Sequence, residues 1–237
     1  MNLSFYSAYT GASQLQSKLD VISNNIANVN TYGYKTKNAG FVDLLYDNIR
    51  EPSGELSIIR QGRGGRVEKT DTLFKQSALA ATDNILDFAL VTDGFFKVQT
   101  PGDHRIYYTR DGSFKLSENI DGNFYLVTSD GNYVLDNDNQ RIQVNSIHDD
   151  IKVGVFDFNH REGFVNVGNN LFEPDVKNGE PFVKEDAMYE RGYLEMSNVD
   201  FAMEMARLMQ TQRNFQMTLR MVQTSDEIEA VFNSLRT

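Results

Sequence analysis

Apolar residues recur at intervals of three and four along the first thirty residues of the chain. The larger ones form one narrow stripe, with polar side chains at the positions between them: Leu15, Leu19, Ile22, Ile26 and Val29. This spacing is typical of a coiled-coil helix, and burying so narrow a stripe requires a second helix. We expect the helix to end between Asn28 and Gly33, because glycine readily adopts the left-handed conformation that closes a helix.

Four asparagines gather at the end of this predicted helix: Asn24, Asn25, Asn28 and Asn30. Asparagine is a poor helix former, so the cluster destabilises the last turns unless its amides hydrogen-bond to something. Two interpretations are open. Either the amides bind neighbouring backbone, or the helix end is frayed and solvated.

A second helical stripe closes the chain. Ser197, Asn198 and Asp200 predict a helix start, because a side-chain oxygen there can accept hydrogen bonds from the free amides of the first turn. The apolar residues that follow keep heptad spacing, with Gln212 as a polar interruption: Met205, Leu208, Phe215, Leu219 and Val222. The stripe then shifts to Ile228, Phe232 and Leu235, which indicates local unwinding or a new partner face. The two terminal stripes therefore need each other, or copies of themselves.

The segments after the first helix suggest a domain boundary. Residues 38–49 are rich in apolar side chains and compatible with a helical continuation, which Pro52 and Gly54 then interrupt. Glycines at 62, 64 and 65 make 51–66 a predicted connector around a brief strand, Leu56–Ile59. We therefore divide the chain into an N-terminal helical segment (1–50), a connector (51–66), a β-rich central domain (67–190) and a C-terminal helical segment (191–237).

The pattern of the central domain has a period of two. Runs of β-branched and aromatic residues occur at 86–91, 95–100, 105–109, 113–116, 123–127, 133–135, 141–144, 151–158 and 163–167. Asp-Gly pairs, a strong hairpin signal, separate several of them: Asp93-Gly94, Asp111-Gly112, Asp121-Gly122 and Asp130-Gly131. The predicted fold class is α+β, with an all-β domain of antiparallel hairpins, twisted into a sandwich or barrel-like core, between long terminal helices that pair as a coiled coil.

Charge and composition narrow the function. The net charge of −10 lies wholly in residues 51–199, which carry 15 basic and 25 acidic groups. An acidic middle repels phosphate backbones and argues against nucleic-acid binding. The chain has no cysteine, so it has neither disulfides nor thiolate metal sites. The N-terminal sequence lacks the basic and apolar regions of a cleaved signal peptide, and no apolar run reaches the length of a membrane span.

The sequence gives little support to catalysis. His104, His148 and His160 are isolated and lack metal-ligand spacing. The run 136–139 lacks the central glycine and final glutamate of a calcium loop, and no Lys-Ser/Thr pair follows Gly62 as in a phosphate loop. We therefore predict no enzymatic activity and no catalytic, cofactor or metal site. The alternative is a β-domain enzyme or carbohydrate-binding module whose helices serve only to dimerise it.

Several motifs resemble one protein family. Residues 24–35, NNIANVNTYGYK, resemble the N-terminal signature of bacterial flagellar rod and hook proteins. Two further segments resemble central elements of that family in the expected order: residues 86–96, and residues 108–114, whose sequence is YTRDGSF. Residues 192–200, GYLEMSNVD, resemble its C-terminal signature, and 213–215 and 223–224 follow on the terminal helix.

The resemblance implies a structural subunit of the flagellar basal-body rod, either proximal or distal. Its terminal helices would line a helical tube with the β domain outside. Its partners would be copies of itself, adjacent rod and hook proteins and the flagellar type III export apparatus, with the surrounding ring proteins as further candidates. It would be exported uncleaved to the periplasm or cell-wall layer, without membrane insertion.

The pattern and the resemblance together define a predicted assembly interface. It comprises the two helical stripes and the motif residues near the helix ends: Leu15, Leu19, Ile22, Asn25, Ile26, Asn28, Val29, Thr31, Gly33, Tyr34, Gly192, Leu194, Glu195, Ser197, Asn198, Val199, Leu208, Phe215, Leu219 and Val222.

Overall fold

The computed structural model describes residues 3–43, 46–50, 56–62, 65–119, 122–144, 146 and 151–236. The chain forms two compact units. The helix unit comprises Met1–Ala27, Lys37–Asp71 and Asp200–Thr237, and the β unit comprises Asn28–Thr36 and Thr72–Val199. These units cross the segment limits expected from the sequence, because 28–36 belongs with the β unit and 67–71 with the helix unit. The predicted α+β class, with terminal helices and a central antiparallel β region, is confirmed.

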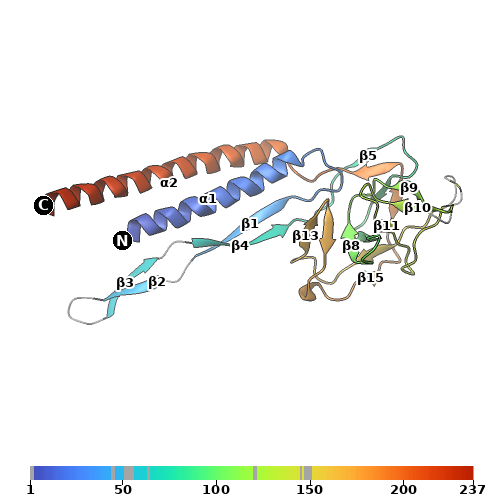
Figure 1. The fold of residues 1–237 in the computed structure, drawn as a ribbon, viewed down its shortest axis with the longest axis horizontal. Helices are drawn as coiled ribbons and strands as arrows, with labels where there is room; N and C mark the ends of the chain where they lie inside the picture. Colours follow the sequence, from blue (N-terminus) through green and yellow to red (C-terminus); the bar gives the residue numbers. More distant parts are fainter. Residues whose placement is uncertain are drawn as a thin grey trace. The chain divides into compact units, whose positions relative to one another are not determined.

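Two antiparallel helices dominate the helix unit (Figure 1): α1, Leu3–Ala27, and α2, Phe201–Arg236. Helix α2 begins where expected, since the Asp200 carboxylate accepts a hydrogen bond from the Met203 amide at 3.0 Å. In α1 the predicted stripe is the covered one, with Ile22 buried and Leu15, Leu19 and Ile26 partly buried. Neither described helix is both long and apolar enough to span a membrane.

The covered stripe of α2 differs from the expected one. Leu208, Phe215 and Val222 are partly buried, but Leu219 is 40% exposed. Met205 is also partly buried, and polar residues share the covered face at intervals of seven: Glu204, Thr211 and Thr218. Thr218 faces Gly11 of α1, since a Cβ built on Gly11 would lie 3.8 Å from Thr218 Cγ2, an ordinary contact distance. Apolar spacing alone therefore missed half of the seam.

Four paired strands complete the helix unit: β1 (Lys37–Asp43) with β4 (Gly65–Thr72), and β2 (Tyr46–Arg50) with β3 (Leu56–Gly62). The expected helical continuation over 38–49 is therefore wrong. Strand β1 pairs with β4, more than twenty residues ahead, and β2 pairs with the nearby β3; strand pairing of this kind overrides a weak local helical pattern. The expected strand at 56–59 is confirmed and is longer than expected. Residues 51–55 and 63–64 of the predicted connector lie outside the described residues.

The β unit contains a nine-stranded sheet in which neighbouring strands run antiparallel. Its main path runs β13-β14-β8-β7-β11-β10-β9, with β12 pairing both β7 and β15. The strands are β7 (Phe95–Gln99), β8 (Ile106–Thr109), β9 (Lys115–Glu118), β10 (Phe124–Val127), β11 (Tyr133–Val134), β12 (Val155–Asp157), β13 (Val165–Gly168), β14 (Leu171–Glu173) and β15 (Phe182–Val183). The expected strand at 141–144 appears only as two isolated bridges.

Two short strand pairs and one helical turn complete this unit. Strand β5 (Leu79–Ala81) pairs with β17 (Tyr193–Glu195), and β6 (Phe88–Leu90) pairs with β16 (Tyr189–Arg191). The 3₁₀ turn η1 spans Val176–Asn178. The segment that leads to α2 is thus paired with strands that come about a hundred residues earlier.

Two of the four Asp-Gly pairs do not form hairpin turns. Asp130-Gly131 turns β10 into its partner β11, and Gly122 lies between the paired strands β9 and β10, whereas Asp121 lies outside the described residues. Asp93-Gly94 and Asp111-Gly112 instead join strands that are not partners. The glycine at 112 serves close packing, since a Cβ there would lie 1.7 Å from the Phe88 carbonyl oxygen.

Two apolar clusters fill the β unit. The larger one includes Phe88, Phe96 and Phe114, and the smaller one packs Phe95 and Tyr108 with further aromatic rings. Within the smaller cluster, most ring pairs meet edge to face, an arrangement that aromatic quadrupoles favour. The β unit therefore has a core of its own.

Candidate functional site

Asn25 joins three elements of the helix unit. Its carbonyl oxygen accepts from the Lys37 amide at 3.0 Å, and its amide nitrogen donates to the Lys37 carbonyl at 2.9 Å. The same nitrogen lies 3.4 Å from an oxygen of Glu204 on α2. One buried side chain therefore ties the end of α1 to β1 and to the start of α2. For Asn25, the interpretation that asparagine amides bind neighbouring backbone is confirmed.

The other asparagines of this helix end have different surroundings. Asn24 and Asn30 are exposed, whereas Asn28 is partly buried and accepts a hydrogen bond from the Thr31 hydroxyl at 3.2 Å. Glu204, which the sequence did not single out, is buried and also bonds Arg207 at 2.7 Å. The signal that could have revealed it is its position one helical turn before Leu208, on the same face of α2.

A buried ionic cluster lies in the β unit. Lys35 Nζ is 2.6 Å from Glu195 Oε1, and Arg110 binds the other carboxylate oxygen at 3.3 Å. These three side chains are almost completely buried. Lys35 also donates to the Lys75 carbonyl at 2.9 Å, and the Ser77 amide donates to Glu195 at 2.9 Å. Four separate segments of the chain therefore meet at one carboxylate.

Burial dominates the electrostatics of this cluster. Desolvation lowers the pKa of Lys35 even though the Glu195 carboxylate favours its charged form. The pKa of Arg110 is lowered for the same reason, against the opposing effects of Glu195 and Asp93. Since both cations lose hydration on folding, they depend on the Glu195 carboxylate for compensation.

Alternating charges continue from Arg110 toward the surface. Arg110 lies 3.7 Å from Asp93, and Arg161 binds both Asp93 at 2.9 Å and Asp157 at 2.7 Å. Burial raises the pKa of Asp157, but hydrogen bonds from Arg161 and from the Phe158 amide outweigh it and hold the pKa below its ordinary value. Sequence reasoning missed Arg110, Asp93, Asp157 and Arg161 as cluster members, although Arg110 lies within the YTRDGSF motif.

The predicted motif residues around this cluster also bind one another. Asn198 accepts from the Thr36 amide at 2.7 Å and from its hydroxyl at 2.6 Å, and donates to the Leu73 carbonyl at 2.8 Å. The Gly33 amide donates to the Glu195 carbonyl at 2.8 Å. Gly33 has φ 68°, and a Cβ there would lie 2.6 Å from the Asp111 nitrogen, so only glycine fits.

Hydrogen bonds also hold residues 192–197, the segment that precedes α2. Gly192, at φ 76°, donates to the Asp87 carbonyl at 2.8 Å and accepts from the Thr82 amide at 2.7 Å. Leu194 is buried in β17, and the Ser197 carbonyl accepts from the Ser77 hydroxyl at 3.0 Å.

The structure thus gives many predicted interface residues a role inside the chain. Asn25, Gly33, Tyr34, Leu194 and Glu195 are buried, and Thr31, Val29 and Val199 are partly buried. Such residues stabilise the fold within each unit. Their direct contact with another subunit stays a prediction.

The exposed surface of α2 is unusually apolar. Large apolar side chains that are half or more exposed follow it along much of its length: Phe201, Met203, Met209, Met217, Met221, Ile228, Val231, Phe232 and Leu235. Scattered exposed apolar residues are ordinary, but a helix that carries so many is typical of an interaction surface.

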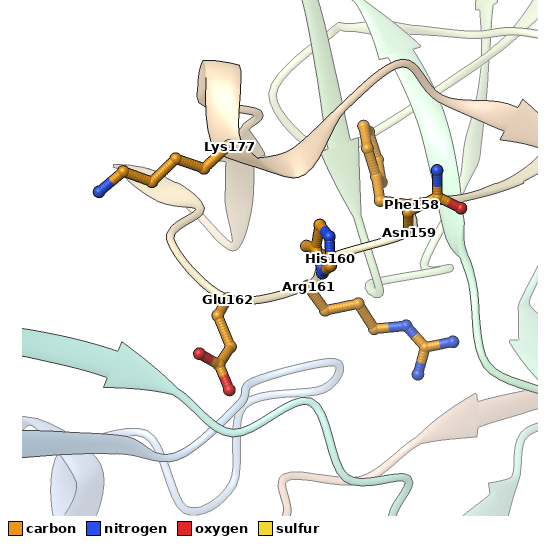
Figure 2. A pocket seen from close by; sticks show the side chains of 6 residues that line it. All are labelled: Phe158, Asn159, His160, Arg161, Glu162 and Lys177. Atoms are coloured by element: carbon orange, nitrogen blue, oxygen red, sulfur yellow. The ribbon is translucent and has the colours of Figure 1, made fainter.

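One pocket of the β unit offers no arrangement for chemistry. It has a volume of about 650 Å³ in the β unit and is lined by Phe158, Asn159, His160, Arg161, Glu162 and Lys177. Figure 2 shows the charged ends of Arg161 and Lys177 pointing away from one another. The Arg161 guanidinium is bound to two carboxylates outside the pocket. Among the residues that the structure describes, no group of three acidic or histidine side chains is placed to hold a metal ion.

Comparisons with known proteins agree on one family. Three family profiles match: Flagella basal body rod protein over residues 5–35, Flagellar hook protein FlgE/F/G D1 domain over 89–156, and Flagellar basal body rod FlgEFG protein C-terminal over 190–235. The flagellar basal-body rod protein FlgG of Bacillus subtilis is 34% identical, covering 95% of this chain and 96% of its own. FlgG of Borreliella burgdorferi is 31% identical, covering 100% and 99%, and the B. subtilis hook-basal body complex protein FlhP is 28% identical, covering 98% and 99%.

Proposed function

The chain belongs to the family of flagellar basal-body rod proteins and is a structural subunit of the rod, and we propose that it polymerises through the exposed faces of its two terminal helices. The observation that carries this proposal is the apolar surface of α2, where Met217 and Met221 are 64% and 63% exposed. Full burial of such a side chain contributes roughly 1.5–3 kcal/mol, and a neighbour that covers the exposed part of Met217 or Met221 would supply the corresponding share. The same family membership favours a structural subunit over a β-domain enzyme or carbohydrate-binding module.

The two stripes of the helix unit would then have separate roles. The covered stripe of α1, with Ile22 at its centre, holds α2 within the subunit. The exposed residues of α2 would hold the neighbouring subunits. A head-to-tail contact that does not close into a ring generates a helical filament, which is the form that a rod needs.

The surroundings of the subunit follow from the same proposal. Its neighbours would be copies of itself and other rod and hook proteins, and it would reach the basal body through the flagellar type III export apparatus without cleavage. It would lie outside the cytoplasm, in the periplasm or cell-wall layer, near the ring proteins. The acidic residues of the central part would keep unassembled subunits apart and soluble.

Substitution of one exposed methionine tests the proposal. In a strain whose own copy of the gene is deleted, Met221→Asp should leave the purified subunit folded but should remove it from isolated basal bodies and abolish swimming. An aspartate in a desolvated contact costs several kcal/mol, which is enough to prevent assembly. Gln216→Asp, at an exposed polar position of the same helix, is the matched control and should assemble.

Leu219→Asp makes a second test, because Leu219 is partly exposed. Ile22→Asp is less informative, since it would also separate α1 from α2 within the subunit. Normal swimming and normal rod content with Met221→Asp and Leu219→Asp would contradict polymerisation through α2.

A further inference from the structure

A basic pocket lies between α1, β1 and α2 in the helix unit. Its volume is about 280 Å³, and its charged lining residues are Lys18, Lys37, Arg207 and Glu204. Val21 and Ile22 provide an apolar wall. The pocket therefore contains three cations and one carboxylate.

The carboxylate is already used within the chain. Glu204 binds Arg207 with one oxygen at 2.7 Å and faces the Asn25 amide with the other. Lys18 lies over the Phe41 ring at 5.9 Å. The described residues offer the Lys37 ammonium neither an ion pair nor a hydrogen bond, and burial lowers the pKa of Lys37. A partly desolvated cation without a counter-charge favours an incoming anion.

The opposite end of the helix unit has the complementary character. Asn25 is opposite Glu204 and Gly11 is opposite Thr218, so the antiparallel register sets Leu3 opposite Asp226. The last ten residues of α2 therefore extend past Leu3 (Figure 1). Their apolar side chains are 52–79% exposed: Ile228, Val231, Phe232 and Leu235.

Acidic residues flank this apolar stripe. At 3.6 residues per turn, Glu227 and Glu229 lie on its two sides, whereas Asp226 lies on the opposite face of the helix. Glu227 also lines one surface hollow together with the four apolar residues. No basic residue occurs between Arg220 and Arg236. This end of α2 is thus both apolar and acidic.

We propose that the acidic, apolar end of α2 in one subunit docks at the basic pocket of a second copy of this chain, with Glu227 directed at Lys37. The proposal rests on the polymerisation proposed above and names its contact. It joins opposite ends of the helix unit, so each subunit presents one free end of each kind and the contact propagates without closing.

The contact must be between subunits. Arg207 at the pocket and Glu227 are twenty residues apart on one helix, or about 30 Å at 1.5 Å per residue.

A disulfide between introduced cysteines can test this contact, because a disulfide requires Cα atoms within about 7 Å of each other. Because the chain has no cysteine of its own, any disulfide reports only on cysteines that are introduced.

The first experiment uses two tagged copies expressed together in the deletion strain. One copy carries Lys37→Cys and the other Glu227→Cys, and mild oxidation of isolated basal bodies should join the two tags in at least a quarter of the chains, because random mixing of the copies pairs the two cysteines for at most half of them. The matched control pairs Lys37→Cys with Asp226→Cys, because Asp226 is adjacent to Glu227 but lies on the opposite face of α2. This pair should give at least tenfold less of the disulfide-linked product. Equal products from both pairs, or no product from the first pair, would overturn the proposal.

The second experiment exchanges the charges. Lys37→Glu and Glu227→Lys should each reduce assembled rods at least tenfold, and the two together in one chain should restore at least half of them. Lys115→Glu, at an exposed position of β9, is the control for a charge reversal elsewhere. Normal assembly of both single variants, or no recovery in the double variant, would overturn the docking. If the unaltered protein itself failed to enter basal bodies and restore swimming, the proposed function would fail instead.

Discussion

The buried carboxylate of Glu195 allows a quantitative test of the β unit. Glu195→Gln keeps the shape of the side chain and one oxygen for the Ser77 amide, but removes the negative charge. Lys35 and Arg110, which lie 2.6 Å and 3.3 Å from the Glu195 carboxylate, would then be buried cations without a compensating negative charge. Their remaining partners are the Lys75 carbonyl and the partly exposed Asp93 at 3.7 Å.

The expected loss is large relative to the stability of a domain. Removing one partner of a buried ion pair costs about 3–5 kcal/mol, because it leaves an uncompensated charge. The whole free energy of unfolding of a domain is only about 5–15 kcal/mol. The free energy of unfolding falls by about 2 kcal/mol for each molar increase in urea, so the urea concentration at the unfolding midpoint should fall by about 1.5–2.5 M.

Urea unfolding followed by tyrosine fluorescence measures this change, since the chain has eleven tyrosines and no tryptophan. Glu190→Gln, at an exposed position of β16, is the matched control and should change the free energy of unfolding by less than about 0.5 kcal/mol. Lys35→Met should also destabilise, and the double variant should lose less than the sum of the two single losses. A midpoint for Glu195→Gln within about 0.3 M of the unaltered protein would refute the reasoning.

Two further predictions concern polar contacts elsewhere in the chain. Asn25→Ala removes both hydrogen bonds to the backbone of β1 and should destabilise the helix unit by about 1–3 kcal/mol, as urea unfolding followed by far-ultraviolet circular dichroism would detect; an unchanged helix signal and midpoint would contradict it. Because the pKa of Asp157 is lowered below 3.8, its contribution to stability is present above pH about 4 and is lost as the pH falls through the lowered value. Arg161→Gln should therefore flatten the acid side of the stability profile, and an identical slope in both proteins would show that this pair does not stabilise the fold.

The sequence predicted the elements that carry a periodic pattern. The stripe of α1, the cap at Asp200 and most strands of the β unit follow from local spacing of residues. It failed where pairing is distant, as for β1, whose partner β4 begins more than twenty residues later. Local propensity contains no information about such partners.

The same limit applies to the candidate site. The motifs around Lys35, Arg110 and Glu195 were visible in the sequence, but that the three charges meet was not. Polar members of the α2 seam, such as Glu204 and Thr211, do not belong to the pattern of apolar residues that predicts a seam. A buried polar residue is predictable only together with the partner that satisfies it.

The division between polar and apolar residues explains how one chain can be both a folded subunit and a part of a polymer. Each unit is closed by polar contacts of defined geometry, Asn25 with Lys37 and Glu204 in one, and Lys35 with Glu195 in the other. Hydrogen bonds and ion pairs specify a unique partner more strictly than apolar contacts do, because a mismatched buried polar group is costly. The apolar surface of α2 beyond Glu204 is therefore not required to stabilise the folded subunit. Under the proposed function it would be available to a neighbour, where its large, non-directional contribution would add most to assembly.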